Sequence, residues 1–574
     1  MILHALTEFY NRKAADPESK IAPVGWEWKE IPFIVVINKK GQFRDFIDTR
    51  EGEVNKKRAK TFLVPKSSKR TVNIKPFLLW DNVEYCLGAN PRTREDIEER
   101  RLSFIKRIEN DCLELIDQIE IRSLLYFLKN NPLHYIENNI SNKDLWLEAL
   151  NSNAFITFRL EDNPESIISD ILRKVKVEKS KEDGVCFITG IKGKIARLHP
   201  PIKGVRGTNT TGGSIVSFNL NSFKSFGKDQ GYNSPISEET AFYYTTALNN
   251  LLAKDSKNKL QLSDSTIVFW TEKKTDKAFD LESNFKWYID DSPKDDPDKG
   301  IRSVKALYNS PYTGKQVPGQ DSRFYILGLS PNSARISVRT WKCDTVVNIS
   351  NRIRQHFDDF EIYRRVKDPE FLSLSQILRS VVLEYKSENI PPNLGGKVLE
   401  SVLDGTPYPE TLFNLCINRI RAERHVTRAR AAIIKAWLNR HSRYYNKNEK
   451  EVAVSLDRSN KNIGYRLGRL FAVIEKIDEE GGSGTIRERF YSAASTSPAS
   501  VFSRLLTLKN HHLAKIDNQG RKVNFEKELG EIFDGIDEFP SHLILKEQGK
   551  FAIGYYHQRQ DYFTSKKENK EKEI

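Results

Sequence analysis

Amide and aromatic side chains are interleaved between Phe218 and Asn233, within the stretch from Val205 to Trp270. Amides form hydrogen bonds with the edges of nucleic-acid bases and rings stack on base faces, so the pattern predicts a surface that inspects bases. A surface loop whose rings pack against the protein has the same composition, and this second interpretation stays open. The amides are Asn219, Asn221, Gln230 and Asn233, and the rings are Phe218, Phe223, Phe226 and Tyr232.

Glycines at positions 204, 207, 212 and 213 precede most of these side chains. Because glycine lacks a side chain, we expect the backbone N–H groups there to approach a ligand closely. The segment just before them holds cations and no acidic residue, which would place phosphate contacts beside base inspection. These cations are Lys192, Lys194, Arg197, Lys203 and Arg206.

A second run of cations lies between Lys56 and Lys75, where no acidic residue occurs. Thr71 and Asn73 lie among these cations as neutral groups that can read a base edge. A solvated surface produces similar runs, so this alternative is equally open. The cations are Lys56, Lys57, Arg58, Lys60, Lys66, Lys69, Arg70 and Lys75.

A third basic concentration falls in the segment from Pro409 to Tyr445, for which the sequence predicts one long helix. Helical spacing places four of its cations on one stripe, which could follow the phosphates of a strand. Ordinary surface charge explains the same spacing. The four cations are Arg421, Arg424, Arg428 and Lys435.

Common catalytic motifs are absent from the sequence: it has no G-x-x-x-x-G-K-[ST] loop, no G-x-S-x-G elbow and no H-E-x-x-H helix. His356, Asp358 and Asp359 come nearest to a metal-binding group, but we expect them on the surface at a helix end. We therefore expect no catalytic residue, no metal and no cofactor. Residues far apart in the sequence can still form an active site.

Hydrophobic patterns predict a mixed first part and a helical second part. We expect hairpins at 31–47 and at 324–341, the latter with its turn at 330–333, and a short strand at 215–218. Residues 92–150 and those from about 346 onward have helical periodicity. The expected fold class is α+β, with a mixed α/β N-terminal portion that contains hairpins, followed by an all-α C-terminal bundle.

Length and charge limit the class of protein. A chain of 574 residues is expected to form several domains. Its formal net charge of +15 favours a polyanionic partner such as nucleic acid. The five cysteines are widely spaced, which indicates free thiols in a reducing cytoplasm, and no apolar run is long enough to span a membrane.

Several long segments, taken together and in this order, resemble a known family. They are MILHALTEFY, KRTVNIKPFLLWDNVEYCLG, SIVSFNLNSFKSFGKDQGYNSPISEETAFYYTTALNNLL, STIVFW, FYILGLSPNSARISVRTW and NRIRAERHVTRARAAIIKAWLNR. Over nearly its whole length the chain resembles the large subunit of the type I-C CRISPR interference complex, the RNA-guided assembly called Cascade. The resemblance implies a prokaryotic, cytoplasmic, non-enzymatic protein. It would recognise the protospacer-adjacent motif (PAM) on duplex DNA and promote strand separation and R-loop formation.

The same resemblance implies several partners and a division of the chain. The partners are a guide CRISPR RNA, double-stranded target DNA and its displaced single strand, the backbone and crRNA-processing subunits of Cascade, a small helical subunit, and a helicase-nuclease. Residues 1–345 would form the mixed region that binds nucleic acid and reads the motif, with an insertion at 275–322. Residues 346–400 would form a helical connector, and residues 401–574 a helical bundle that resembles the small subunit.

Within that role we expect two groups of contacts. The motif would be read by Lys69, Arg70, Thr71, Asn73, Asn219, Asn221, Gln230 and Asn233. Phosphates would be held by Lys56, Lys57, Arg58, Lys203, Arg206, Arg421, Arg424, Arg428 and Lys435.

Two other classes of protein fit the same composition. One is a nucleic-acid-cleaving enzyme with a metal site that no motif reveals, and the other is a free-standing DNA-binding regulator. One departure concerns the small subunit, which in this family is generally also translated from the last part of the gene. Met1 is the only methionine, so an internal start would need a non-AUG codon, for example at Val426, Val452 or Val454. Two alternatives stay open: the small subunit is supplied otherwise, or an internal methionine has been removed from this sequence.

Overall fold

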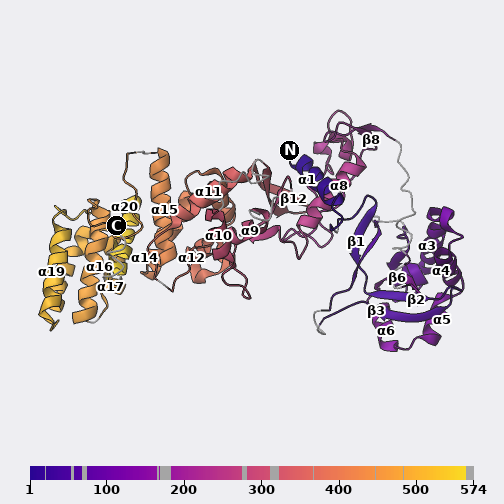
Figure 1. Ribbon diagram of the computed structural model, residues 1–574, viewed down its shortest axis with the longest axis horizontal. Coiled ribbons are helices and arrows are strands. Elements are labelled where there is room, and N and C mark those ends of the chain that lie inside the picture. The colour runs from indigo at the N-terminus through magenta and orange to yellow at the C-terminus, as the bar shows by residue number, and fades with distance from the viewer. Residues whose placement is uncertain are drawn as a thin grey trace. The chain divides into compact units, whose positions relative to one another are not determined.

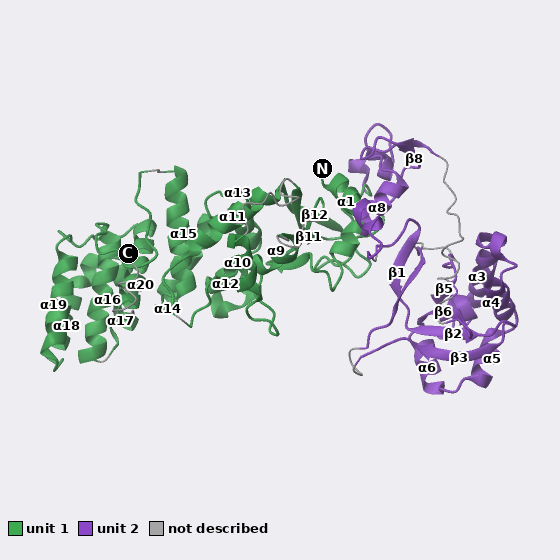
Figure 2. Cartoon of the chain, viewed as in Figure 1, with its two compact units in different colours: residues 1–9, 199–219, 247–574 green, residues 10–198, 220–246 purple. Residues whose placement is uncertain are grey.

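The computed structural model of the chain (Figure 1) forms two compact units, shown in Figure 2. Unit 1 comprises Met1–Phe9, His199–Asn219 and Ala247–Ile574, and unit 2 comprises Tyr10–Leu198 and Leu220–Thr246. The structure describes residues 1–19, 21–52, 57–67, 74–163, 167, 182–273, 281–309, 322–365, 367–445, 448–482 and 484–563. Strands and helices occur in both units, and the last described part is helical, which confirms the α+β class.

The larger part of unit 2 is built on a four-stranded sheet of order β3-β2-β6-β5. The predicted hairpin is confirmed, since β2 pairs with β3 in antiparallel register. Strand β6 pairs parallel with β2 and antiparallel with β5. A separate antiparallel pair joins β1 and β4. The strands are β1 (Trp26–Glu30), β2 (Phe33–Ile37), β3 (Phe43–Asp48), β4 (Thr61–Pro65), β5 (Trp80–Asn82) and β6 (Phe155–Leu160).

Helices fill the connection that the parallel pair β2 and β6 requires, which confirms the helical prediction for 92–150. Their apolar faces form one core with the sheet, in which Phe104 and Phe127 each contact Phe158 of β6. The helices are α2 (Val83–Leu87), α3 (Ile97–Asp111), η1 (Leu113–Leu115), α4 (Ile119–Lys129), α5 (Pro132–Asn139) and α6 (Lys143–Asn151).

Short elements make up the rest of unit 2 and lead into a helix. They are β7 (Gly184–Val185), β8 (Lys192–Gly193), η2 (Asn221–Phe223), η3 (Gln230–Asn233) and α8 (Glu238–Leu251). The boundary between the units falls inside α8 and inside α1 (Ile2–Ala14).

In unit 1, the short strand predicted at 215–218 does not form. Among the described residues, the nearby pairing consists of single bridges from Gly213 to Ile202 and from Ser214 to Arg335. A strand needs a neighbour along its length, so the apolar character of this segment is not sufficient.

The sheet of unit 1 has the order β12-β11-β10-β9, and each neighbouring pair is antiparallel. The predicted hairpin is confirmed, but β11 continues to Asn332, so the turn lies later than 330–333. The strands are β9 (Lys259–Leu262), β10 (Ser265–Thr271), β11 (Arg323–Asn332) and β12 (Arg335–Thr345). Helices α9 (Leu281–Ile289) and α10 (Lys299–Asn309), from the expected insertion, bury Phe285 and Leu307 in the core of the same unit.

The remainder of unit 1 is helical, as the periodicity from residue 346 predicted. One prediction is wrong: the chain from 409 to 445 forms two helices, not one. Arg424 adopts a left-handed conformation with φ 54° after the first helix, and Val426 turns into the core. The helices are α11 (Val346–Phe360), α12 (Leu374–Ser380), η5 (Leu383–Tyr385), η6 (Ser387–Asn389), α13 (Leu394–Asp404), α14 (Glu410–Glu423), α15 (Arg428–Tyr445), α16 (Ile463–Gly481), α17 (Ile486–Thr496), η7 (Pro498–Ser500), α18 (Phe502–Ala514), α19 (Gln519–Phe533) and α20 (Leu545–Asp561).

Glycines allow α16 and α20 to pack with their backbones in close approach. A Cβ atom added to Gly468 would lie 2.0 Å from the Phe551 carbonyl oxygen, and one added to Gly554 would lie 2.1 Å from the Tyr465 carbonyl oxygen. Any other residue at either position would force the two helices apart.

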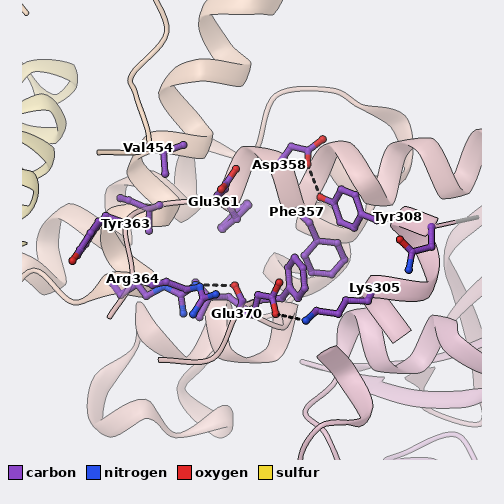
Figure 3. A pocket seen from close by; sticks show the side chains of 15 residues that line it. Lys305, Tyr308, Phe357, Asp358, Glu361, Tyr363, Arg364, Glu370 and Val454 are labelled. Carbon is purple, nitrogen blue, oxygen red and sulfur yellow. Dashed lines mark hydrogen bonds and ion pairs between the residues drawn. The ribbon is translucent and has the colours of Figure 1, made fainter. Parts of the chain in front are cut away.

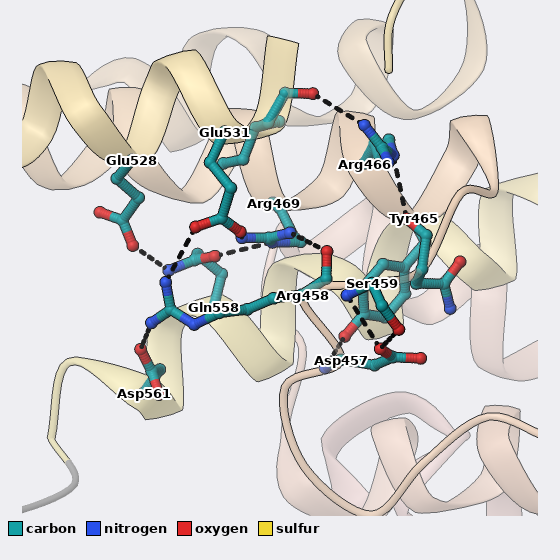
Figure 4. Close-up of polar contacts among 12 residues, drawn as sticks. Asp457, Arg458, Ser459, Tyr465, Arg466, Arg469, Glu528, Glu531, Gln558 and Asp561 are labelled. Atoms are coloured by element: carbon teal, nitrogen blue, oxygen red, sulfur yellow. Dashed lines mark hydrogen bonds and ion pairs between the residues drawn. The ribbon is translucent and has the colours of Figure 1, made fainter. Parts of the chain in front are cut away.

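Buried polar groups join the same helices to their neighbours (Figure 4). The Arg469 side chain is 1% exposed, and it donates to Gln558 at 3.0 Å and to Glu531 at 2.8 Å. Arg458, at the surface, donates to Glu531 and Asp561. Because buried charges need specific partners, these contacts favour one arrangement of α16, α19 and α20. None of the helices in the described part of the chain combines the length and apolar character needed to cross a membrane.

We predict that Gly468→Ala destabilises the α16–α20 pair by about 2 kcal/mol, because the new methyl group overlaps the Phe551 carbonyl oxygen. The matched control is Gly530→Ala on α19, where an added Cβ meets no atom within 4 Å. That change should stabilise its helix by about 0.5–1 kcal/mol, since alanine has the higher helix propensity. Amide hydrogen exchange of α16 and α19 measures both effects. If both substitutions changed the stability of their helices in the same direction, the packing described would be contradicted.

Candidate nucleic-acid interface

The loop of residues 220–234 in unit 2, hereafter the 220–234 loop, is held in shape by the side chain of Asn233. Its amide nitrogen donates to the carbonyl oxygens of Lys228 and Gln230, each at 3.0 Å, and its oxygen accepts from the Ser225 N–H at 2.9 Å. These three bonds use both N–H groups and the oxygen of the Asn233 side-chain amide, and all three partners lie within the loop. Asn233 therefore shapes the loop. Since its amide is already bonded within the loop, its neighbours are better placed to contact a base edge.

The base of the loop lies close to the segment that follows β8. The Gly231 N–H donates to the Arg197 carbonyl oxygen at 3.0 Å, and a Cβ atom at Gly231 would lie 2.0 Å from the Ala196 carbonyl oxygen. The Tyr232 hydroxyl donates to Asp183 at 2.9 Å. Hydrogen bonds from the Ile195 N–H and from Tyr232 hold the pKa of Asp183 below its usual value, so the carboxylate stays ionised near neutral pH.

An open pocket of about 530 Å³ lies beside this anchored base. Its lining combines two carboxylates, a cation and a ring, from Asp183, Asp229, Lys228 and Tyr232, with the apolar side chains of Ile195 and Pro235. Groups of these kinds can contact the edge, phosphate and face of a nucleotide.

The four amides predicted to read bases have different environments. Asn221 is exposed, and Gln230 is half-buried with φ 45°. Asn219 belongs to unit 1, where its oxygen accepts a hydrogen bond from Arg335. Of the four, Asn221 presents its side chain to solvent in the 220–234 loop.

Lys203 and Arg206 have exposed side chains in unit 1, while their backbones are fixed. The Lys203 N–H donates to Asn249 at 2.8 Å, and the Arg206 N–H donates to Thr266 at 3.1 Å. The intervening Gly204 has φ 90°, and a Cβ atom there would lie 2.6 Å from the Leu252 carbonyl oxygen. This glycine thus permits close packing of the chain on itself, a role that the sequence pattern did not reveal.

The earlier basic run is only partly described. Lys57 and Arg58 are exposed shortly before β4. Lys56, Lys69, Arg70, Thr71 and Asn73 lie outside the described residues.

The predicted stripe of cations at 421–435 is interrupted because the chain forms two helices there. Arg424 is exposed at the break and Arg421 is half-buried. Arg428 donates to the Glu370 carbonyl oxygen at 3.1 Å, and burial lowers its pKa. Lys435 is 4% exposed, and its ammonium group lies 3.1 Å from the Asp359 carbonyl oxygen. These last two cations contribute to the fold of unit 1.

His356 and Asp359 are buried, so the expectation that they lie on the surface is wrong. The Nδ1 atom of His356 lies 2.8 Å from the Tyr408 hydroxyl, and Asp359 forms an ion pair with buried Arg440. Asp358 is exposed and accepts from the Tyr308 hydroxyl. Among the described residues, no three His, Cys, Asp or Glu side chains lie together as a metal site requires.

A larger pocket, of about 740 Å³, lies in unit 1 near these residues (Figure 3). Lys305 and Glu370 form an ion pair of 2.9 Å on its wall, and Tyr308 is bonded to Asp358. These groups already have protein partners, and the lining also contains Glu361 and Arg364.

Comparison with known families identifies a family to which the chain is similar. A family model described as CRISPR-associated protein (Cas_Csd1) matches residues 6–563, which is nearly the whole chain. A search of curated proteins found no match.

We predict a pH-dependent effect of His356→Phe. Burial, together with the charge of Arg440, lowers the pKa of His356 from 6.5 to about 3. The unfolded chain therefore binds a proton that the folded protein excludes, and stability is lost as the pH falls from about 6.5 toward 3. At pH 4.5 this loss amounts to about 3 kcal/mol, and the variant lacks it.

Chemical unfolding at pH 7.5 and 4.5 measures the difference. The free energy of unfolding of His356→Phe, relative to that of the wild type, should be higher at pH 4.5 than at pH 7.5. If this relative value were the same at both pH values, His356 would not be a buried neutral imidazole. The same change at the exposed His542 controls for the loss of an imidazole.

Proposed function

Because the chain belongs to the Cas_Csd1 family of CRISPR-associated proteins, we propose that it is the large subunit of a type I-C Cascade complex and recognises the PAM on duplex DNA. The family match supports a Cascade subunit in general. In the proposed role, base pairing with a guide RNA reads the long target sequence, and the protein inspects only a few base pairs. It then promotes strand separation and R-loop formation, and helps to recruit a separate helicase-nuclease.

The observation that carries this proposal is the braced 220–234 loop. Inspection of a short motif requires polar groups that are exposed yet held in a defined conformation. Asn221 is exposed, Lys228 is exposed beside the pocket, and Asn233 fixes the backbone between Ser225 and Gln230. An amide can pair with a base edge while a lysine contacts phosphate.

Exposed cations elsewhere in the chain are candidates for phosphate contacts in the same role. Lys203 and Arg206 combine exposed cations with a fixed backbone, which suits contacts that hold DNA without reading its sequence. Lys57, Arg58 and Arg424 are further exposed candidates. Lys69, Arg70, Thr71 and Asn73 remain proposed motif readers on the basis of their sequence.

The proposal is of a non-enzymatic protein of the prokaryotic cytoplasm. Its partners would be guide RNA, duplex target and displaced strand, the other Cascade subunits including a small helical one, and the helicase-nuclease. A nuclease activity is the competing hypothesis. DNA cleavage by the purified chain with a divalent metal, lost on changing Asp358, would favour it.

We predict that Asn221→Ala weakens binding of the assembled, guide-loaded complex by about 10-fold on targets that carry the motif, since one base-edge contact is lost. Targets without the motif should bind the variant and the wild type equally. Equilibrium binding to the two duplexes measures the difference.

Lys228→Ala is the matched control from the same loop. Loss of a phosphate contact should weaken binding of both duplexes alike. It should also lower the number of ions released on binding, measured from the salt dependence of the affinity, by about one. If Asn221→Ala also weakened both duplexes alike, Asn221 would not read a base. If the wild-type complex did not distinguish the two duplexes, the proposed function would be rejected.

A further inference from the structure

Phe226 presents an exposed aromatic ring at the tip of the 220–234 loop. Its exposed fraction is 96%, the highest among the large apolar side chains in the described part of the chain. It is the only apolar side chain between Lys224 and Gln230. The ring is therefore not explained by packing within the protein, because burial is what stabilises an apolar side chain.

The backbone at Phe226 is also unfavourable for a phenylalanine. Phe226 has φ 50° and Gly227 has φ 69°, and the Lys228 N–H donates to the Ser225 carbonyl oxygen at 3.0 Å. Two central residues with positive φ are typical of a type I′ turn, which takes asparagine, aspartate or glycine at its first central position. A bulky residue there is an outlier, and such strain persists only where the surroundings impose it.

The surroundings of the turn impose this conformation on both sides. Asn233 bonds to the backbone of Ser225 before the ring and of Lys228 after it. Lys224 and Asp229 form an ion pair of 2.7 Å across the turn. The backbone that carries the ring is thus held in one conformation before any partner arrives, which lowers the entropy lost on binding.

The chemistry around the ring favours a nucleobase over a protein partner. A protein hot spot is usually surrounded by other apolar contacts that exclude water. Here the chain neighbours are Ser225, Gly227 and two lysines, of which Lys224 is paired with Asp229 and Lys228 is exposed beside the pocket. A single flat ring beside an exposed cation matches the pairing of base stacking with phosphate contact in proteins that bind unpaired strands.

We propose that the Phe226 ring stacks on a base that becomes unpaired next to the motif and so stabilises the first opened position of the duplex. This inference rests on the proposed function. It assigns to a phenyl ring a step that the polar residues of the same loop do not perform, because an apolar wedge can replace the stacking that a base loses on opening.

The test uses the assembled, guide-loaded complex and targets that are opened beside the motif by mismatches, with 2-aminopurine at successive unpaired positions, because this base is already quenched by stacking inside an intact duplex. Stacking on an aromatic ring quenches this base. With the wild type we expect quenching at one position. Phe226→Ala should abolish it and weaken target binding by about 10-fold. Phe226→Trp should retain both properties, whereas Phe226→Leu, apolar but not flat, should lose the quenching.

Phe187→Ala is the matched control, since Phe187 is a 70% exposed phenylalanine in unit 2 that lies outside the loop. It should leave quenching and binding unchanged. Three results would overturn the inference: unchanged quenching and binding in Phe226→Ala, an equal effect of Phe187→Ala, or loss of the Phe226→Ala chain from the complex. The last would place the ring at a protein contact.

The same experiment separates this inference from the proposed function. If the wild-type complex prefers motif-bearing duplexes but Phe226→Ala behaves as wild type, only the role of the ring fails. If the wild-type complex shows no such preference, the proposed function fails and the inference falls with it.

Discussion

The hydrogen bonds of Asn233 are the interaction on which the candidate interface depends. A loop with two lysines, two glycines, three serines and two phenylalanines has little reason to adopt one conformation, because it buries few apolar side chains. One amide that bonds to three backbone positions replaces that missing core. As a result, the backbone of residues 225–230, which carries Phe226, is held in one conformation while the Phe226 side chain remains open to solvent.

Net charge is a poor guide to which cations of this protein are exposed and free to meet a polyanion. Several cations that look like surface charge in the sequence are used inside unit 1. Arg440 forms a buried ion pair with Asp359, and the ammonium group of Lys435 bonds to backbone carbonyls. The cations that remain exposed in the described residues, such as Lys203 and Arg206, have neighbouring backbone contacts that fix their position. Charge together with exposure and a fixed backbone is the more useful criterion.

The helical part of unit 1 depends on a different constraint. Close approach of α16 and α20 at Gly468 and Gly554 leaves no space for side chains, and the buried Arg469 side chain is satisfied by Gln558 and Glu531. Such packing tolerates little rearrangement. Rigid support in one part of the protein and a locally braced loop in another fit a subunit that must keep its shape within a larger assembly.

Much of the fold follows from the sequence by itself. Alternating and helical periodicity determined the two hairpins, the helices of 92–150 and the helical region after 346, because burial of one face is local information. The ordered motifs also determined the family. Only the tertiary structure decided that Asn233 bonds inward while Asn221 faces solvent, that the chain breaks at Arg424, and that His356 is buried. These outcomes depend on which distant backbone or side-chain groups come within hydrogen-bonding or van der Waals distance, and the spacing of residues along the chain does not contain that information.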